Sequence, residues 1–303
     1  MPTFCRHGRM QATCPICSKA DAPVSRPRPE RAPRVRSGVT RTPKASSGIK
    51  VRRVERAPED GYDNELVPGL RASADGARLA DELAFSAARL DELASDPPGL
   101  YAEADADLAF LIAYVSPGRG GDPWPEIEAA RAGDWEAVTG GLRTAHDPAR
   151  GTATVDAWRA WSERGGGAEA ALGGDADWEP TRRFARTFER LTLPGFGRGP
   201  KYDFLVTLGA LGIVDVEAGT LAVGKDALDP VISSAKRVLG IGDAINLERR
   251  AAELARGCGV PFAALDLALF NFARPEDERA TMGARVAADP ERRAAIGAAL
   301  GGV

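Results

Sequence analysis

The sequence predicts an all-α protein, and three observations carry this prediction. Leucines recur at helical spacing within residues 77–94, which would give a helix one apolar face. The apolar run 107–115 is followed at once by the helix-breaking sequence Ser-Pro-Gly. Alternation of apolar and polar residues, the pattern of a half-buried strand, is scarce. Hydrophobic residues make up 44% and charged residues 27% of the chain, as in ordinary globular proteins.

We expect the helical body to span residues 63–303. Beyond the two segments above, the apolar pattern predicts further helices at 125–137, 153–164, 178–191, 200–212, 230–239, 244–256, 261–273 and 275–299. Glycines at 165–167 and 173–174 predict a flexible surface loop between two of these helices.

Charge is unevenly distributed along the chain. Residues 1–60 hold 14 of the 40 Lys and Arg residues but only 5 of the 43 Asp and Glu residues, so the remainder is acidic. Residues 20–62 are rich in Pro, Arg and Ser and lack apolar periodicity, which predicts a disordered basic linker. Such an arm either meets a polyanion or acts as a solvated tether.

Three of the four cysteines fall within residues 1–19. Cys5 and His7 precede Cys14 and Cys17 in the spacing C-x-H-x6-C-x2-C. A C-x2-C turn presents two thiolates to one metal ion, and Zn²⁺ prefers four sulfur or nitrogen ligands. We therefore expect a structural zinc-binding knuckle, because so small a unit has no core of its own. A redox pair is the alternative for the two later cysteines.

The segment 191–205, LTLPGFGRGPKYDFL, connects two expected helices. Gly195, Gly197 and Gly199 permit positive φ and leave backbone amides uncovered. Amides at a helix start favour an anion, so the segment predicts a DNA phosphate contact; a plain connecting loop is the alternative. Basic residues that would add backbone contacts are Arg182, Arg183, Arg186, Arg190, Arg198 and Lys201.

These residues carry a resemblance to a known family. Leu193-Pro194-Gly195-Phe196-Gly197 resembles the L-P-G-V-G hairpin of the helix-hairpin-helix DNA glycosylase superfamily, the endonuclease III group. Residues 110–116 are similar to the helix end that in this family delivers residues, here Ser116, into the DNA. Residues 227–230 are similar to the place where an aspartate begins the helix after the hairpin. Residues 63–300 as a whole resemble the alpha-glutamyl/putrescinyl thymine pyrophosphorylase branch, which is associated with hypermodified bases of phage DNA.

The resemblance assigns catalysis to Asp229, whose carboxylate would stabilise positive charge on the deoxyribose and align a water. Because the chain between hairpin and aspartate is long, Asp226 and Asp215 are alternatives. Family members with lyase activity carry a lysine where this chain has Gly199. Lys201 is the nearest amine, either as a nucleophile or on phosphate, and the missing lysine favours a monofunctional enzyme.

Base excision requires the target base to leave the stack. The candidates for a base pocket or wedge are aromatic, and each is otherwise a core residue: Tyr114, Trp124, Trp178, Phe196 and Tyr202. The glycine-rich segment 118–124 would form a loop over the base.

We therefore expect a cytoplasmic DNA glycosylase that binds double-stranded DNA and hydrolyses the N-glycosidic bond of modified bases, in antiviral defence or repair. The alternatives are a transferase or pyrophosphorylase that builds hypermodified thymine, and a non-catalytic DNA-binding protein. No apolar run reaches the roughly 18 residues of a membrane helix, and the start has no secretory signal, so we expect no membrane partner. Zinc is the only cofactor expected, and its role is structural.

Overall fold

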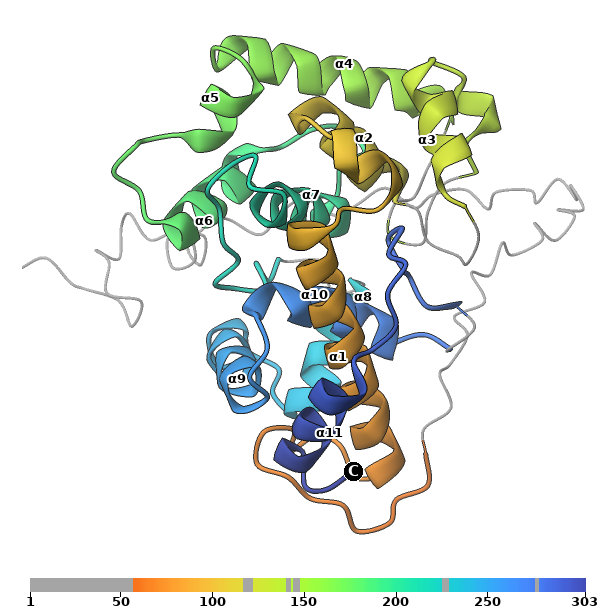
Figure 1. Cartoon of the computed structure of the whole chain (residues 1–303). Coiled ribbons are helices and arrows are strands. Elements are labelled where there is room, and N and C mark those ends of the chain that lie inside the picture. The colour runs from red at the N-terminus through yellow and green to blue at the C-terminus, as the bar shows by residue number, and fades with distance from the viewer. Residues whose placement is uncertain (1–56, 117–121, 140–142, 144–147, 225–228, 276–277) are drawn as a thin grey trace, which may run out of the picture. The chain divides into compact units, whose positions relative to one another are not determined.

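A computed structural model of the chain describes residues 57–303, apart from 117–121, 140–142, 144–147, 225–228 and 276–277 (Figure 1). The described residues form helices joined by turns, with one isolated β-bridge and no strand, which confirms the all-α prediction for this part of the chain. The expected zinc unit and most of the linker lie outside the described residues. No helix in the described part is long and apolar enough to cross a membrane.

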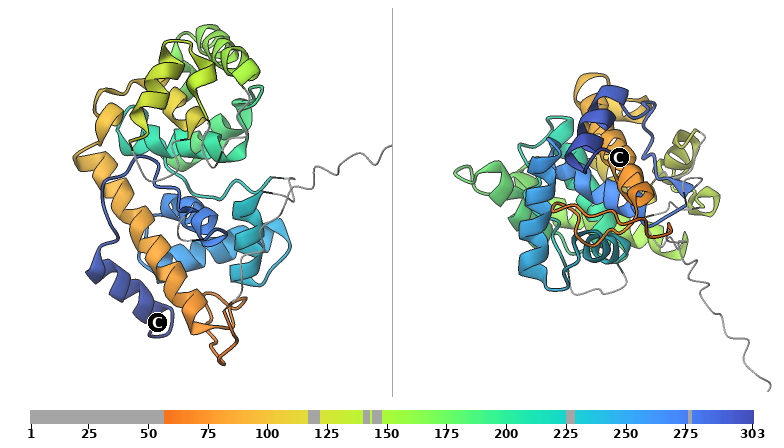
Figure 2. Two further views of the ribbon diagram at one scale, coloured as in Figure 1. Left: turned by 90° about the vertical axis from the view of Figure 1, so that its right-hand side faces the viewer. Right: turned by 90° about the horizontal axis from the view of Figure 1, so that it is seen from below.

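A first hydrophobic core is built by helices from both ends of the described chain. They are α1 (Ser73–Ser95), α8 (Pro230–Leu239), α9 (Ala244–Gly257), α10 (Phe262–Phe272) and α11 (Pro290–Ala299). α1 lies alongside α10 and α11 (Figures 1 and 2). The predicted leucine repeat explains this packing, because Leu79 and Leu83 are fully buried on one face of α1.

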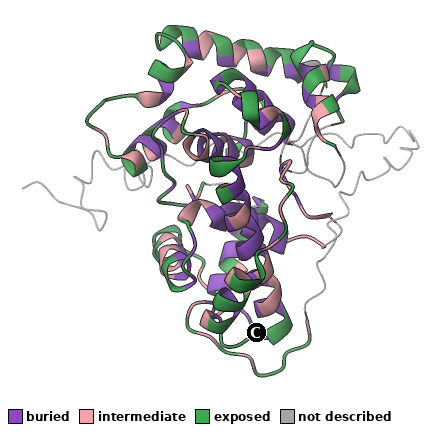
Figure 3. Cartoon of the chain, in the orientation of Figure 1, coloured by how far each residue is buried: buried purple, intermediate pink, exposed green. Residues whose placement is uncertain are grey.

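A second core is built by the helices in the middle of the chain. They are α2 (Ala106–Val115), α3 (Trp124–Arg131), α4 (Pro148–Arg164), α5 (Ala168–Gly173), α6 (Pro180–Arg190) and α7 (Arg198–Ala210), with the 3-10 helices η2 (Gly99–Glu103) and η3 (Trp135–Ala137). Aromatic rings dominate it: Phe110 stacks on Trp158 with centroids 4.7 Å apart. α1 reaches this core too, through Leu93, so one long helix contributes to both cores. Figure 3 shows the buried residues in purple.

Several features of the body differ from the sequence-based expectations. The loop predicted between the glycines at 165–167 and 173–174 contains a helix, α5, and the helix predicted over 125–137 ends at Arg131, before the separate 3-10 helix η3. The helix predicted over 275–299 is wrong in its first half, since only Pro290–Ala299 is α-helical. The residues before it are held by distant partners: Tyr101 Oη donates to Met282 O at 3.1 Å, and Arg285 Nε donates to Glu92 at 3.2 Å. The body also begins before residue 63, because Tyr62 packs against the first core and its hydroxyl donates to Leu300 O at 2.6 Å.

Candidate active site

The hairpin, residues 191–197, joins α6 to α7. Phe196 N donates to Leu193 O at 3.3 Å, and the two residues form the isolated β-bridge. Gly195 has a φ of +72°, in the left-handed region that favours glycine, whereas Gly197 has a φ of −71° and is the N-cap of α7. Phe196 points inward at 4% exposure, while Pro194 and both glycines are exposed. The exposed tip is therefore backbone-rich, as a phosphate contact requires.

The remaining glycine and the lysine of this segment face the protein. Gly199 lies inside α7 without positive φ, and a Cβ built there would lie 3.4 Å from Nε of Arg143. The Arg143 guanidinium thus fills the space that a longer side chain at residue 199 would enter. Lys201 Nζ donates to Phe188 O at 2.9 Å and lies 4.3 Å from the centre of that ring. Burial lowers the pKa of Lys201.

Asp229 is the N-cap of α8, as its position before a proline predicts. Its Oδ1 accepts from the amides of Val231 at 2.9 Å and Ile232 at 3.2 Å. Its Oδ2 lies 3.6 Å from Nη1 of Arg198, the first residue after the hairpin. The side chain is 10% exposed. One oxygen is thus fixed by the helix start, and the other faces the hairpin helix.

The sequence predicts a phosphate contact for Arg198, but its side chain is turned inward and is only 11% exposed. Nε donates to Leu221 O at 3.1 Å and to Ala222 O at 3.3 Å, and Nη2 donates to Asp266 Oδ2 at 2.5 Å. Ala222 has a φ of +49°, a left-handed conformation that a residue with a side chain rarely adopts. One guanidinium therefore joins α7, α10 and a strained loop that leads toward Asp229.

These contacts belong to a buried arginine–aspartate cluster, formed by Arg143, Arg198, Asp203 and Asp266. Nε of Arg143 lies 3.0 Å from Asp203 Oδ2, and its Nη2 donates to Asp266. Desolvation raises the pKa of Asp203 to about 6, against the attraction of Arg143. Desolvation also acts to raise the pKa of Asp266, but Arg198 and Arg143 outweigh it, so this pKa is lowered. Sequence reasoning missed the cluster, because no spacing pattern links its members.

The aromatic candidates are mostly core residues. Tyr114 and Tyr202 are each 1% exposed, and the Tyr202 hydroxyl donates to Thr220 O at 3.0 Å. Trp124 is half-buried and packs edge-on against Tyr101, with centroids 5.5 Å apart. These three side chains are held by protein contacts in the structure, so we do not include them in the proposed reaction site.

Ser116 is also fully buried. It is the C-cap of α2 with a φ of +53°, and its Oγ lies 3.9 Å from the sulfur of Met282, whose φ is +52°. Two residues with side chains thus hold left-handed conformations in mutual contact, a form of local strain. In this structure the Ser116 side chain contacts protein and is not exposed toward DNA.

The arginines of α6 are partly used inside the protein. Arg183 Nη1 donates to Asp215 Oδ2 at 2.7 Å, and Arg190 Nη2 donates to Ala171 O at 2.8 Å. Asp215, one of the two alternatives to Asp229, is 76% exposed in this pair. Arg186 is exposed and pairs with Glu189 one helical turn away, at 3.1 Å. The basic face predicted around the hairpin is therefore smaller than the residue count suggests.

Several predicted site residues lie outside the described residues: Asp226 and the four zinc ligands Cys5, His7, Cys14 and Cys17. Within the described part of the chain, no cluster of His, Cys, Asp or Glu side chains has the grouping of a metal site. Cys258, the remaining cysteine, is a buried free thiol, and desolvation raises its pKa to about 11.

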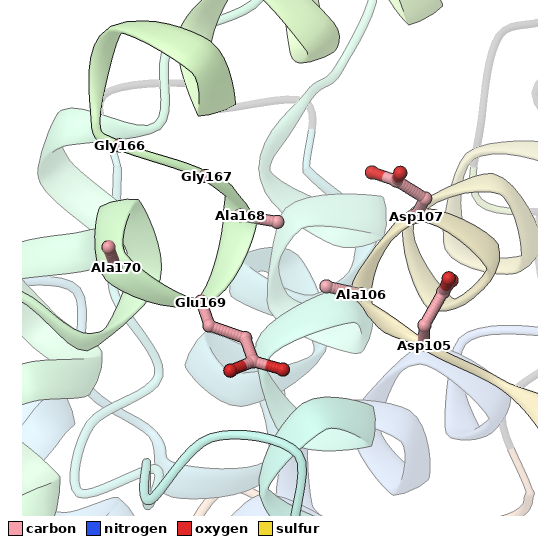
Figure 4. Close-up of a pocket in the computed structure, with 8 residues that line it drawn as sticks. All are labelled: Asp105, Ala106, Asp107, Gly166, Gly167, Ala168, Glu169 and Ala170. Atoms are coloured by element: carbon pink, nitrogen blue, oxygen red, sulfur yellow. The ribbon is translucent and has the colours of Figure 1, made fainter.

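A hollow of about 440 Å³ lies between the start of α2 and α5 (Figure 4). Three acidic side chains line it, those of Asp105, Asp107 and Glu169. The first two have structural partners: Asp105 Oδ1 caps α2 by accepting from Leu108 N at 2.8 Å, and Asp107 Oδ1 accepts from the Trp158 indole at 2.7 Å. This hollow shares no residue with the hairpin or with Asp229, so it is not the predicted site.

A second glycine turn, residues 240–243, joins α8 to α9 and is absent from the sequence-based predictions. Gly240-Ile241-Gly242 repeats the glycine–hydrophobic–glycine pattern of the hairpin, and this pattern is the signal that could have found it. Gly240 has a φ of +66°, close to that of Gly195. Asp243 then caps α9 by accepting from Asn246 N at 3.0 Å.

Comparisons of the chain with protein-family models, with curated proteins and with solved structures find no significant match.

Proposed function

We propose that the protein is a DNA glycosylase that hydrolyses the N-glycosidic bond of a modified base and leaves an abasic site. The observation that carries this proposal is the pairing of the hairpin with Asp229. One oxygen of this carboxylate is fixed by two amides of α8, and the other lies 3.6 Å from the guanidinium of the first residue after the hairpin. Arg198 thus brings together a turn whose exposed backbone can bind phosphate and a carboxylate that the start of α8 orients.

The chemistry follows from the charge that develops as the bond breaks. Departure of a base builds positive charge on the deoxyribose, in an oxocarbenium-like transition state. A carboxylate that is already oriented stabilises this charge without reorganising, and it can align the attacking water. Asp229 meets the first requirement because two amides of α8 hold its Oδ1 and the guanidinium of Arg198 faces its Oδ2. The target base would have to leave the duplex to reach it.

The exposed tip of the hairpin supports a DNA-backbone contact. Pro194, Gly195 and Gly197 place little side chain over the backbone there, and α7 begins at the next residue with its positive dipole end. Such a contact positions DNA without reading its sequence. The choice of hypermodified phage pyrimidines as substrate, and a role in antiviral defence, rest on the family resemblance.

Two contacts favour a monofunctional enzyme that stops at the abasic site. A lyase requires an amine that attacks the sugar carbon to form an imine. The space beside Gly199 holds the guanidinium of Arg143, a group that stays protonated and is not a nucleophile. Lys201 is bound to the carbonyl of Phe188 on α6. We therefore expect strand breaks only after alkali treatment.

A pair of matched substitutions tests this proposal. Asp229→Asn keeps the N-cap, since Asn caps helices as well as Asp, but it removes the charge. We expect base release from phage DNA with hypermodified pyrimidines to fall about 100- to 1000-fold, with DNA affinity unchanged. Asp243→Asn makes the same change at the cap of α9 and should leave base release unchanged. Full activity of Asp229→Asn would overturn the assignment.

We also propose that Cys5, His7, Cys14 and Cys17 hold one structural zinc ion. Metal analysis of the purified chain should find one zinc per molecule, and Cys14→Ser should lower this content. Zinc content that is unchanged in this variant would contradict the ligand assignment.

A further inference from the structure

We propose that Arg198 is a positioning residue for Asp229, so that its role is to hold the carboxylate and not to bind DNA phosphate. This inference rests on the proposed function. The inference rests on the contacts of one guanidinium. Two of its nitrogens bind a backbone carbonyl and Asp266, and the third faces Asp229.

The guanidinium of Arg198 is anchored on two sides. Nε and Nη2 are bound to the carbonyl of Leu221, and Nη2 also donates to Asp266 Oδ2. Asp266 is 1% exposed and accepts from Arg143 as well, so the carboxylate that holds Arg198 is itself held. The ring of Tyr202 lies 5.3 Å from Cζ. Because the guanidinium is planar, fixing Nε and Nη2 also fixes the position of Nη1.

The third corner of the fork, Nη1, faces Asp229. It has no hydrogen-bond partner among the described residues, although it is buried, and it lies 3.6 Å from Asp229 Oδ2. Oδ1 of the same carboxylate is already occupied by the two helix amides. Arg198 therefore sets the electrostatic environment of Asp229 Oδ2, the carboxylate oxygen that does not accept from the helix amides.

The loop between the hairpin helix and α8 is held by the same side chain. Glu248 of α9 accepts from Leu221 N at 2.7 Å and Val223 N at 3.0 Å, while Arg198 binds the carbonyls of Leu221 and Ala222. The side chains of Glu248 and Arg198 therefore bind the loop around Ala222, the residue with left-handed φ. Holding strain in the segment that precedes a reactive group is typical of functional sites.

The two roles predict different consequences of Arg198→Lys, which keeps the charge but loses the fork. For a positioning role, the single-turnover rate of base release from hypermodified phage DNA falls about 100-fold, because the carboxylate is displaced. The dissociation constant for an unmodified duplex and its dependence on salt stay as in the unaltered protein. For a phosphate contact, Arg198→Lys leaves the rate nearly unchanged. Arg198→Gln, which removes the charge, then lowers affinity and shrinks the slope of log K against log salt by about 0.9. For a positioning role, Arg198→Gln leaves both the affinity and this slope unchanged.

Two further variants make the test decisive. Asp266→Asn removes the anchor of Arg198 without altering the hairpin helix, and it should slow base release while leaving the salt slope unchanged. Arg256→Lys changes an exposed arginine of α9 in the same way and should leave both quantities unchanged. Circular dichroism and thermal melting confirm that each variant is folded before its rate is compared.

A reduced salt slope in Arg198→Gln, or unchanged rates in both Arg198→Lys and Asp266→Asn, would overturn the positioning role while the glycosylase assignment stands. If the unaltered protein releases no base from any modified DNA, the proposed function fails and the positioning role fails with it.

Discussion

The hairpin and the second glycine turn share a sequence pattern but differ in the residues that come after them. Each has a glycine with positive φ, then a hydrophobic residue, then a second glycine. After the hairpin comes Arg198, which is drawn inward by buried carboxylates. After the second turn come an exposed cap, Asp243, and Ile245, which is 85% exposed. Glycines therefore shape both turns, whereas buried carboxylates on distant helices draw only the residue after the hairpin into the protein.

The largest expected difference lies in the hydrophobic residue at the middle of each turn. Phe196 is buried among Phe110, Tyr114 and Phe204, whereas Ile241 is only half-buried. Phe196→Ala should lower the free energy of unfolding by about 3–5 kcal/mol, and Ile241→Ala by about 1 kcal/mol. Chemical denaturation measures both values. Equal losses of unfolding free energy in the two variants would contradict this difference, because they would show that the two turns are equally well packed.

The next difference is that the contributions of two aspartates to stability change with pH in opposite directions. Asp203 lies in the cluster beneath the hairpin, and desolvation raises its pKa to about 6, so the folded state holds its proton longer. Stability should therefore fall by up to about 3 kcal/mol as pH rises from about 4 to about 6. Asp243 is exposed, and hydrogen bonds from Asn246 lower its pKa. Its contribution is present above the ordinary aspartate pKa and is lost as pH falls through the lowered value.

Unfolding by urea at a series of pH values separates the two groups. Asp203→Asn should remove the decline between about pH 4 and pH 6, and Asp243→Asn should alter only the profile at lower pH. An Asp203→Asn profile parallel to that of the unaltered protein would contradict the raised pKa.

The smallest expected effect concerns the two glycines of the hairpin. A Cβ on Gly195 would lie 3.0 Å from Thr154 Oγ1, and its φ is positive, so Gly195→Ser should destabilise the fold by about 1–2 kcal/mol. Gly197 has a φ of −71° and no atom within 4 Å of its Cβ position. As an N-cap, Gly197→Ser should be neutral or stabilising by a few tenths of a kcal/mol. Thermal unfolding checks both, and the reverse order would disprove the assignment of the cap.

Local sequence signals are sufficient for much of the helical body. Asp229-Pro230 marks the start of α8 because aspartate caps a helix and proline suits its first turn. The same reasoning fails before α11, where the apolar pattern predicts a helix from residue 275. There Met282 and Arg285 are held by Tyr101 and Glu92, partners nearly 200 positions away, and such contacts override a local preference.

The candidate site is predictable only in part, for the same reason. Asp229 follows from its local pattern, and the exposed tip of the hairpin follows from its glycines. The inward direction of Arg198 could not be predicted, because it depends on Asp266, which lies 68 positions away on α10. A sequence alone assigns arginines to solvent or phosphate, since the buried carboxylates that pair with them leave no spacing signal.

Product analysis by mass spectrometry is the most direct test of base excision by this protein. The unaltered protein is incubated with phage DNA that carries hypermodified pyrimidines. The masses of the DNA and of the small molecules released are then measured. We expect free modified base, together with DNA that has lost the same mass and breaks only in alkali. A gain of mass in the DNA would indicate a transferase, unchanged DNA would indicate a binding protein, and either result would contradict the assignment as a glycosylase.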